Sequence, residues 1–218
     1  MSDEQTWPAP PASGAGRAQR PQKRSGRRRA EILDAAMTVF GERGYANGSL
    51  QDIADRVGMT HAGVLHHFGS KEQLLIALLE YRDDADVAEL EGHHAPRGAP
   101  LLEHLVDTAE ENSKRPGIVQ TYTVLLGESV TDKHPARNFF AGRFAGLRDM
   151  ITSAVADATD RSMDDPEVIG AASAVIATMD GLQTQWLLDK DAVDMRAVVD
   201  LTIRALVREL TKPADVIA

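Results

Sequence analysis

The sequence predicts an all-α fold of about nine helices, and three observations support this. Apolar residues recur at intervals of three and four along most of the 218 residues. Glycine, proline or a capping residue separates each such segment from the next. Strand-like alternation of apolar and polar residues persists nowhere. Apolar residues make up 43% of the sequence, close to the share in soluble globular proteins, so the chain can bury a sizeable core.

Residues 1–25 are predicted to form a disordered, basic and proline-rich tail, because their Pro, Ala, Ser and Gly bury too little apolar area to offset ordering entropy. The segment 17–29 holds seven basic residues and no acidic one. Such a run can neutralise phosphates, although it is more often a solvated tail. The net charge of −9 hides this asymmetry, because residues 1–71 carry +3 and residues 72–218 carry −12.

Four helices are expected in the first ninety residues, delimited by capping residues and glycines. In chain order, the signals are a start near Arg27, stops at Gly41 and Gly44, a capping box of Ser49 and Asp52, a stop at Gly58, a cap at Thr60 for a helix through His67, and a capping box of Ser70 and Gln73.

The stretch from Gly92 to Pro100 contains two prolines and two glycines, which indicates a break and a nearby domain boundary. Helical periodicity resumes beyond it, and the last two helices carry long apolar stripes that fit either a core or a subunit interface. The expected helices lie near 101–114, 117–130, 136–159, 166–188 and 195–211.

Several function classes have no support in the sequence. The absence of cysteine excludes disulfides, thiol nucleophiles and iron–sulfur clusters. No apolar run approaches the ~18 residues of a membrane span and no secretory signal is recognisable, so we expect a cytoplasmic protein. A phosphate loop and an HExxH motif are missing, so an enzyme is not expected, and neither is a cofactor or a metal site.

Residues 50–68 have the pattern of a helix-turn-helix motif: a short helix, a tight turn at Gly58 and a second short helix. Ala54 is small where the two helices must cross, and Val64 and Phe68 can anchor the second helix to the first helix of the chain. The second helix is then free to present small and hydrogen-bonding side chains to the major groove of DNA.

The stretch from Arg29 to Leu75 resembles the TetR family of transcriptional regulators. The resemblance rests on four segments in the expected order and spacing. They are Arg29-Ala-Glu-Ile-Leu-Asp-Ala-Ala36, the Phe40-Gly-Glu-Arg-Gly-Tyr45 turn, the helix from Ser49 to Gly58, and His67-Phe68-Gly-Ser-Lys71-Glu-Gln-Leu-Leu75. One departure is Leu65, where the family often has a tyrosine that contacts phosphate.

The resemblance implies phosphate contacts from Ser49, from His66 or His67 and from Lys71, and base contacts from the start of the second helix. Lys71 also has an independent rationale, because the first turn of a helix favours an anion such as phosphate. Adjacent histidines on a helix point about 100° apart, which argues against a shared metal at His66 and His67. With the basic run included, the expected DNA-binding residues are Arg27, Arg28, Arg29, Ser49, Thr60, His61, Ala62, Gly63, His66, His67 and Lys71.

The segment Asp180-Gly-Leu-Gln-Thr-Gln-Trp-Leu-Leu-Asp189 resembles the regulatory domains of the same family. This implies that the last two helices pair with their symmetry mates in a homodimer, through Val175, Leu182, Trp186, Leu201 and Ala205. Residues 101–160 would then enclose an effector cavity. Its candidate lining, in which each residue is also explicable as plain core, is His104, Tyr122, Glu128, Phe140, Phe144, Met179, Gln183 and Trp186.

The resulting prediction is a homodimeric repressor that a small-molecule effector releases from a palindromic operator. The alternatives are a helical adaptor that binds proteins and an enzyme. The expected organisation is a tail over 1–25, a helix-turn-helix domain over 26–72, a connecting helix over 73–91, and an effector-binding and dimerisation domain over 92–218.

Overall fold

The structure of the chain is a computed structural model that describes residues 19–87 and 95–212, with side-chain surroundings over 25–83 and 95–212. These residues form nine α-helices and no strand, which confirms the predicted fold class. The helices are α1 (Gln19–Asn47), α2 (Leu50–Arg56), α3 (His61–Phe68), α4 (Lys71–Val87), α5 (Pro100–Lys114), α6 (Pro116–Ser129), α7 (Arg137–Thr159), α8 (Pro166–Leu188) and α9 (Met195–Leu210).

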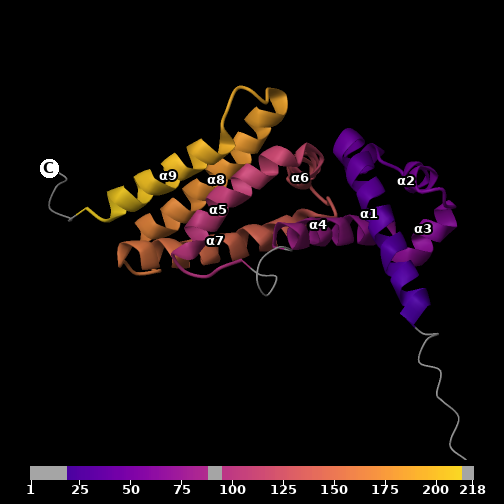
Figure 1. Cartoon of the computed structure of the whole chain (residues 1–218), viewed down its shortest axis with the longest axis horizontal. Helices are drawn as coiled ribbons and strands as arrows, with labels where there is room; N and C mark the ends of the chain where they lie inside the picture. Colours follow the sequence, from indigo (N-terminus) through magenta and orange to yellow (C-terminus); the bar gives the residue numbers. More distant parts are fainter. Residues whose placement is uncertain (1–18, 88–94, 213–218) are drawn as a thin grey trace, which may run out of the picture.

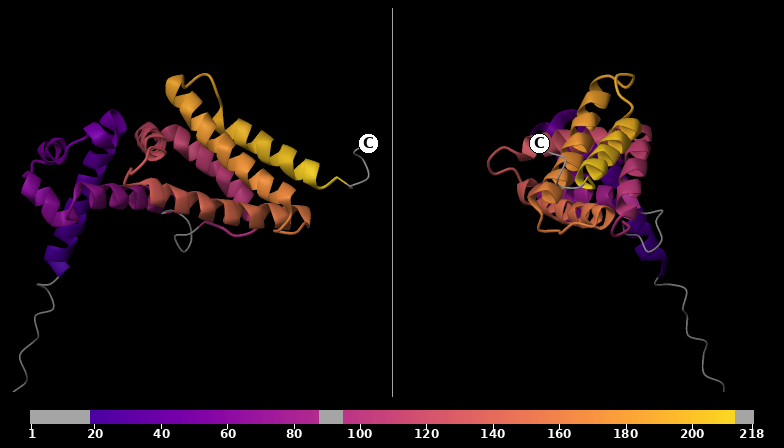
Figure 2. Two further views of the ribbon diagram at one scale, coloured as in Figure 1. Left: turned by 180° about the vertical axis from the view of Figure 1, so that it is seen from behind. Right: turned by 90° about the vertical axis from the view of Figure 1, so that its left-hand side faces the viewer.

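The helices form a small amino-terminal unit at one end of an elongated body (Figure 1). Helices α1, α2 and α3 make up this unit, and α4 runs from it alongside the body. The body contains α5 to α9, and Figure 2 shows these five helices gathered around one another when the molecule is viewed from its end. No described helix is long and apolar enough to cross a membrane.

The sequence predicts the local starts and stops of the first helices well. Ser49 accepts a hydrogen bond from the backbone N–H of Asp52 at 3.0 Å, and Thr60 accepts one from Gly63 at 3.1 Å. Ser70 caps α4 through the N–H of Gln73, also at 3.0 Å. Gly58 has a φ of +62°, the left-handed conformation that the tight turn between α2 and α3 requires.

The predicted tail needs a correction, because α1 already begins at Gln19. Residues 19–25 are therefore helical, and residues 1–18 lie outside the described part of the chain. Pro21 stands in the first turn of α1, where a missing N–H costs no helical hydrogen bond. The glutamine, lysine and arginine residues that follow it favour helix, so the basic run extends α1.

Two buried clusters hold the molecule together, and the first crosses from the amino-terminal unit into the body. Its fully buried members include Ile32 and Phe40 of α1 and Leu75 of α4, together with residues of α2 and α3. From the body, Tyr122 of α6 and Phe140 of α7 belong to the same cluster. The second cluster joins α5, α7, α8 and α9 and includes Val119 of α6. The amino-terminal unit is therefore packed against the body rather than joined to it by a linker alone.

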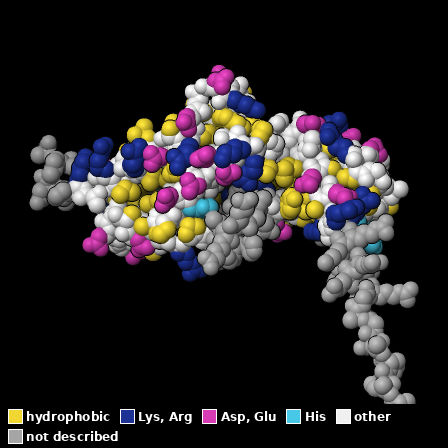
Figure 3. Space-filling view, viewed as in Figure 1, with side chains coloured by type: hydrophobic (Ala, Val, Ile, Leu, Met, Phe, Trp, Pro, Cys, Tyr) yellow, Lys and Arg dark blue, Asp and Glu magenta, His cyan; other side chains and the backbone are white. Residues whose placement is uncertain are grey.

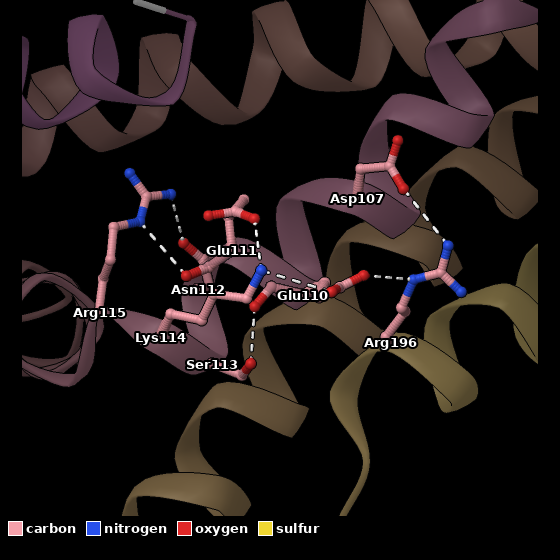
Figure 4. A network of polar contacts seen from close by, with 8 residues as sticks. All are labelled: Asp107, Glu110, Glu111, Asn112, Ser113, Lys114, Arg115 and Arg196. Atoms are coloured by element: carbon pink, nitrogen blue, oxygen red, sulfur yellow. Dashed lines mark hydrogen bonds and ion pairs between the residues drawn. The ribbon is translucent and has the colours of Figure 1, made fainter. Parts of the chain in front are cut away.

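Exposed ion pairs connect α5 to α9 on the surface of the body (Figure 4). Arg196 of α9 contacts Glu110 and Asp107 of α5 at 2.8 Å and 3.4 Å, and within α5 Lys114 contacts Glu111 at 2.7 Å. Since these charges are solvent-exposed, each pair contributes little to the stability of the fold. At the inner end of this network Arg115 donates to Oδ1 of the buried Asn112 at 3.2 Å.

The contact between the unit and the body is closest at the end of α1. Gly44 interrupts the helical backbone there with φ +72° and ψ 175°. The next residue, Tyr45, donates its backbone N–H to Oε2 of Glu128 on α6 at 2.7 Å. The left-handed φ of Gly44 favours glycine, and a Cβ there would also force the end of the Glu128 side chain to shift away from the Tyr45 N–H.

We expect Gly44→Ala to destabilise the protein by about 1–3 kcal/mol, the usual cost of a residue in a conformation that only glycine adopts freely. The melting temperature measured by circular dichroism should fall by several degrees. The control is Gly127→Ala, because Gly127 is exposed on α6 with nothing within 4 Å of a new Cβ. Equal stability of the two variants would contradict this account of Gly44.

Candidate nucleic-acid interface and regulatory cavity

Helix α3 presents one face to solvent and buries the other. Val64 and Phe68 are buried against α1, whereas His61, Ala62 and His66 are exposed. The short side chains at the start of the helix leave room for the edges of bases, and an α-helix fits the major groove of B-DNA. The rings of His66 and His67 meet edge to face at 5.9 Å. This arrangement is suited to contact with DNA.

Two of the predicted DNA-binding residues also have structural roles, because their hydroxyl groups cap helices. Thr60 caps α3, and Ser49 caps α2 while donating to Oδ2 of Asp52 at 2.7 Å. This hydrogen bond, together with the nearby Arg43 guanidinium, lowers the pKa of Asp52 below its usual value. Both hydroxyl groups therefore sit at helix amino termini, where N–H groups favour an anion.

The three consecutive arginines of α1, Arg27 to Arg29, differ in their surroundings. Arg29 lies 4.2 Å from the centre of the Phe68 ring and donates to the carbonyl of His67 at 3.1 Å, so it fastens α1 to α3. Arg28 donates to Glu31 at 2.7 Å. Arg27 also contacts Glu31, at 3.2 Å, but its side chain is 81% exposed. Of the three, Arg27 is the most available to a phosphate.

Lys71 occupies the first turn of α4, next to the end of α3. Its Nζ lies 4.4 Å from the centre of the Tyr45 ring and 3.5 Å from the carbonyl oxygen of Ala46. Partial burial lowers the pKa of this lysine, and the negative charge of Glu128 opposes that effect. The residue therefore touches the junction near Gly44 as well as the surface beside α3.

Figure 3 shows basic and acidic side chains mixed with hydrophobic ones over the visible face of the molecule. The charge asymmetry lies along the sequence instead, with +3 over residues 1–71 and −12 over residues 72–218, and it is compatible with a local DNA-binding surface near the amino terminus.

A cavity of about 310 Å³ lies inside the body between α4, α5, α6, α7 and α8. Four of the eight residues predicted to line it do so: His104, Tyr122, Met179 and Gln183. The walls are mainly apolar, as is usual for small-molecule sites. Its full lining is Arg82, Asp83, Ala95, Leu101, His104, Leu105, Thr108, Asn112, Tyr122, Arg143, Leu147, Met150, Ile151, Ile176, Met179, Asp180 and Gln183.

The other four predictions for the cavity are corrected. Glu128 lies at the junction with Tyr45, where its carboxylate accepts a backbone hydrogen bond. Phe140 packs edge to face on Tyr122 at 5.5 Å, within the cluster that joins the amino-terminal unit to the body. Phe144 packs against the second cluster, and Trp186 belongs to it. These three aromatic residues therefore belong to the packed clusters of the core and not to the lining of the cavity.

The prediction for the subunit interface is also revised. Val175, Leu182 and Trp186 are at most 5% exposed and form part of the core of their own chain, so they offer almost no surface to a partner. Leu201, at 59% exposed, and Ala205 lie on the open face of α9. The apolar stripe of α8 therefore faces inward, and the sequence alone did not distinguish that arrangement from an interface.

One end of the cavity holds a cluster of charged groups around Tyr122. The guanidinium carbons of Arg82 and Arg143 lie 4.4 Å and 5.6 Å from the centre of this ring. Asp83 contacts both arginines, Arg143 at 2.5 Å and Arg82 at 3.0 Å. Desolvation by burial raises the pKa of the nearby Asp180 to about 6, although the two arginines act in the opposite direction.

Sequence reasoning missed Arg82, Arg143 and Asp180 because charged residues on helices are usually solvated. A signal was nevertheless present for two of them. Arg82 follows Leu75 by seven residues and Leu78 by four, and Asp180 follows Ile176 by four, so each continues an apolar helical face. A charged residue on such a face is a candidate for a buried polar site.

Comparisons with known proteins agree with this arrangement. Residues 32–78 match the profile of "Bacterial regulatory proteins, tetR family", and residues 100–211 match "BetI-type transcriptional repressor, C-terminal". The chain is 28% identical over 183 residues to the transcriptional regulator TtgR of Pseudomonas putida, covering 79% of this chain and 86% of TtgR. It is 29% identical over 188 residues to the regulator BetI of Rhizobium meliloti, covering 80% and 85% of the two chains.

Solved structures share the fold. The SmeT–triclosan complex aligns with a TM-score of 0.67 and 21% identity over 88% of this chain and 98% of SmeT. SmeT is described as the repressor of a multidrug efflux pump of Stenotrophomonas maltophilia. A TetR-family regulator from Rhodococcus sp. aligns with a TM-score of 0.65 and 24% identity over 84% and 99% of the two chains.

The helix-turn-helix unit and the helical body each match their counterparts in one family, in the same order along the chain. The protein belongs to the TetR family of bacterial transcriptional regulators.

Proposed function

We propose that this regulator is a homodimeric repressor that a small molecule, bound in the central cavity, releases from an inverted-repeat operator. One observation carries the proposal: α4 begins directly after the recognition helix α3, and its far end supplies Arg82 and Asp83 to the cavity wall. A single helix of 17 residues, about 25 Å long, joins the two sites.

The mechanism is a difference in affinity between two conformations. The ligand is proposed to prefer a position of α4 in which the spacing between the two recognition helices does not match the operator. DNA affinity then falls about tenfold for each 1.4 kcal/mol of that preference. A second connection runs through α6, where Thr121 and Gln120 donate to the carbonyls of Met37 and Gly41 at 2.8 Å and 3.1 Å. Movement of the cavity wall would thus reach α1 as well as α3.

The domain boundaries follow from this mechanism. We propose that the DNA-binding unit spans α1 to α3, that α4 connects it to the body, and that residues from α5 onward form the effector and dimerisation domain. Helix α4 belongs to both parts, since its first half packs with α1 and its second half faces the cavity. Function through binding in the cytoplasm, rather than through catalysis, is part of the same proposal.

Dimerisation is supported by the open faces of α8 and α9. Ile169 and Leu188 on α8 and Leu201 on α9 are large apolar residues that are 38%, 84% and 59% exposed. Small residues accompany them, including Gly170, Ala177 and Gly181 on α8, which allows close approach of a second helix. A two-fold axis would place two copies of α3 in successive major grooves about 34–36 Å apart.

A related solved structure supports an effector role for the cavity. The structure of SmeT with triclosan is a complex of a related fold with a small molecule. The cavity of this chain has a volume at the lower end of the usual range of about 300–1,000 Å³ for ligand sites. Selection of bound duplexes from random-sequence DNA, by the purified protein, tests whether an inverted repeat is recognised.

Lys71→Ala should weaken binding to the selected duplex and reduce the slope of log affinity against log salt by about 1, because one phosphate contact is lost. Fluorescence anisotropy over a salt series measures both quantities. Lys190→Ala, a change at the turn after α8, serves as the control and should leave the slope unchanged. If the Lys71 variant keeps the wild-type slope, Lys71 does not contact phosphate.

Leu201→Glu should convert the dimer into a monomer, because it places a charge on the apolar face proposed to meet its symmetry mate. Sedimentation velocity gives the mass, and binding to the inverted repeat should fall in parallel. Val130→Glu is a matched control, since Val130 is 71% exposed on the α6–α7 connection. A Leu201 variant that remains dimeric would place the interface elsewhere.

Asp180→Asn should stabilise the protein at pH 8 and have little effect near pH 4. The pKa of Asp180 is raised to about 6 in the folded protein, so its ionised form opposes folding, and that penalty disappears as the pH falls from about 6 to below 4. Melting temperatures across this range test the prediction. Asp149→Asn on the exposed part of α7 controls for the loss of one negative charge. A difference between wild type and the Asp180 variant that does not depend on pH would contradict it.

A further inference from the structure

The side-chain amide of Gln183 is buried in the cavity wall, and its hydrogen bonding within the described residues is incomplete. Gln183 on α8 is 5% exposed, and its side chain faces both the cavity and a smaller void between α5, α8 and α9. Its Oε1 has no hydrogen-bond partner within the described part of the chain. Buried polar atoms are nearly always paired in native proteins, and an unpaired one destabilises the folded state.

A second buried amide that borders the same two spaces differs in this respect. Asn112 on α5 is 1% exposed and borders the cavity and the smaller void, as Gln183 does. Its Oδ1 accepts a hydrogen bond from Arg115 at 3.2 Å (Figure 4). Within the described residues, the amide oxygen of Asn112 is therefore paired and that of Gln183 is not. The unpaired acceptor needs a donor from outside the chain.

The charges at the Tyr122 end of the cavity restrict the class of molecule that brings this donor. Arg82 and Arg143 already lie beside the aromatic ring of Tyr122, so a cationic ligand would meet like charge there. Asp83 contacts both guanidinium groups, and Asp180 adds a second carboxyl group one turn before Gln183. The cluster thus contains its own counter-charges and does not require an anionic ligand.

Most of the remaining wall surface is apolar, and the polar residues His104 and Thr108 also border the cavity. Leu101, Leu105, Leu147, Ile151 and Ile176 contribute aliphatic surface, and Met179 lies on the same helix as Gln183. The volume of about 310 Å³ suits a compact molecule.

We propose that the cavity binds a compact, uncharged and mainly apolar molecule that carries an O–H or N–H donor, and that Gln183 Oε1 accepts the hydrogen bond from it. This inference rests on the proposed role of the cavity as an effector site and specifies its ligand class. Gln183 is then a specificity-determining residue whose polar group lowers the stability of the empty protein.

The test compares two probes that share an apolar body. The first, 4-butylphenol, carries a donor, whereas its methyl ether, 4-butylanisole, keeps the oxygen but cannot donate. Isothermal titration calorimetry measures the affinity of each for wild-type protein and for Gln183→Met, which is similar in shape but lacks the amide. Comparing the ratio of the two affinities between proteins cancels the effect of the extra methyl group.

We expect the phenol-to-ether affinity ratio to be about tenfold higher in wild type than in the Gln183 variant, equivalent to about 1.4 kcal/mol. The empty Gln183→Met protein should melt about 2–4 °C higher than wild type, because an unpaired buried acceptor is removed. Gln51→Met, an exposed change on α2, controls for the substitution itself. A third probe, 4-butylbenzoate, should bind more weakly than the phenol.

Three results would overturn the inference: equal ratios in the two proteins, tighter binding of the benzoate than of the phenol, or a lower melting temperature for empty Gln183→Met. Failure of all three probes to bind also counts against it. These outcomes are distinct from failure of the proposed function. Phenol binding that depends on Gln183 but leaves DNA affinity unchanged would contradict the effector role and leave the ligand class standing.

Discussion

The continuity of α4 is the constraint on which the rest of the structure depends. The helix starts beside α3, where Ser70 caps its first turn. Further along, its residues Arg82 and Asp83 line the cavity. Leu74, Leu75, Leu78 and Leu79 are buried along its length, so it cannot move without disturbing the core of the amino-terminal unit. A rigid helix held in this way transmits displacement rather than absorbing it.

The polar groups buried in the body are costly, and their positions are informative for that reason. Asp180 has a raised pKa, and Gln183 leaves an acceptor unpaired, although α8 is otherwise one of the most apolar helices of the chain. A helix selected for stability alone would carry leucine or methionine at such positions. Both residues face the cavity, so the destabilising groups are gathered where a ligand would compensate for them.

Much of this protein could be predicted from its sequence. Helix boundaries were accurate where capping residues mark them, as at Ser49, Thr60 and Ser70, because a cap is a local interaction. The inward direction of the α8 stripe could not be predicted, and only half of the residues expected to line the cavity do so. Val175 and Trp186 satisfy the same helical pattern whether they face their own core or a partner, and only the packing of α8 against α7 and α9 decides between the two. The extension of α1 to Gln19 was missed for a related reason, since a basic segment has no apolar face to indicate a helix.

The most direct test of the account is the distance between the two recognition units of a dimer, with and without a ligand in the cavity. The chain has no native cysteine, so a single Gln51→Cys on the exposed face of α2 carries one spin label per subunit. Electron double resonance then gives the label-to-label distance in the presence of the selected duplex, of 4-butylphenol, or of neither. The account predicts one narrow distance with DNA and a clearly different one with the phenol. The same distribution in both states, or no inter-subunit distance at all, would contradict it.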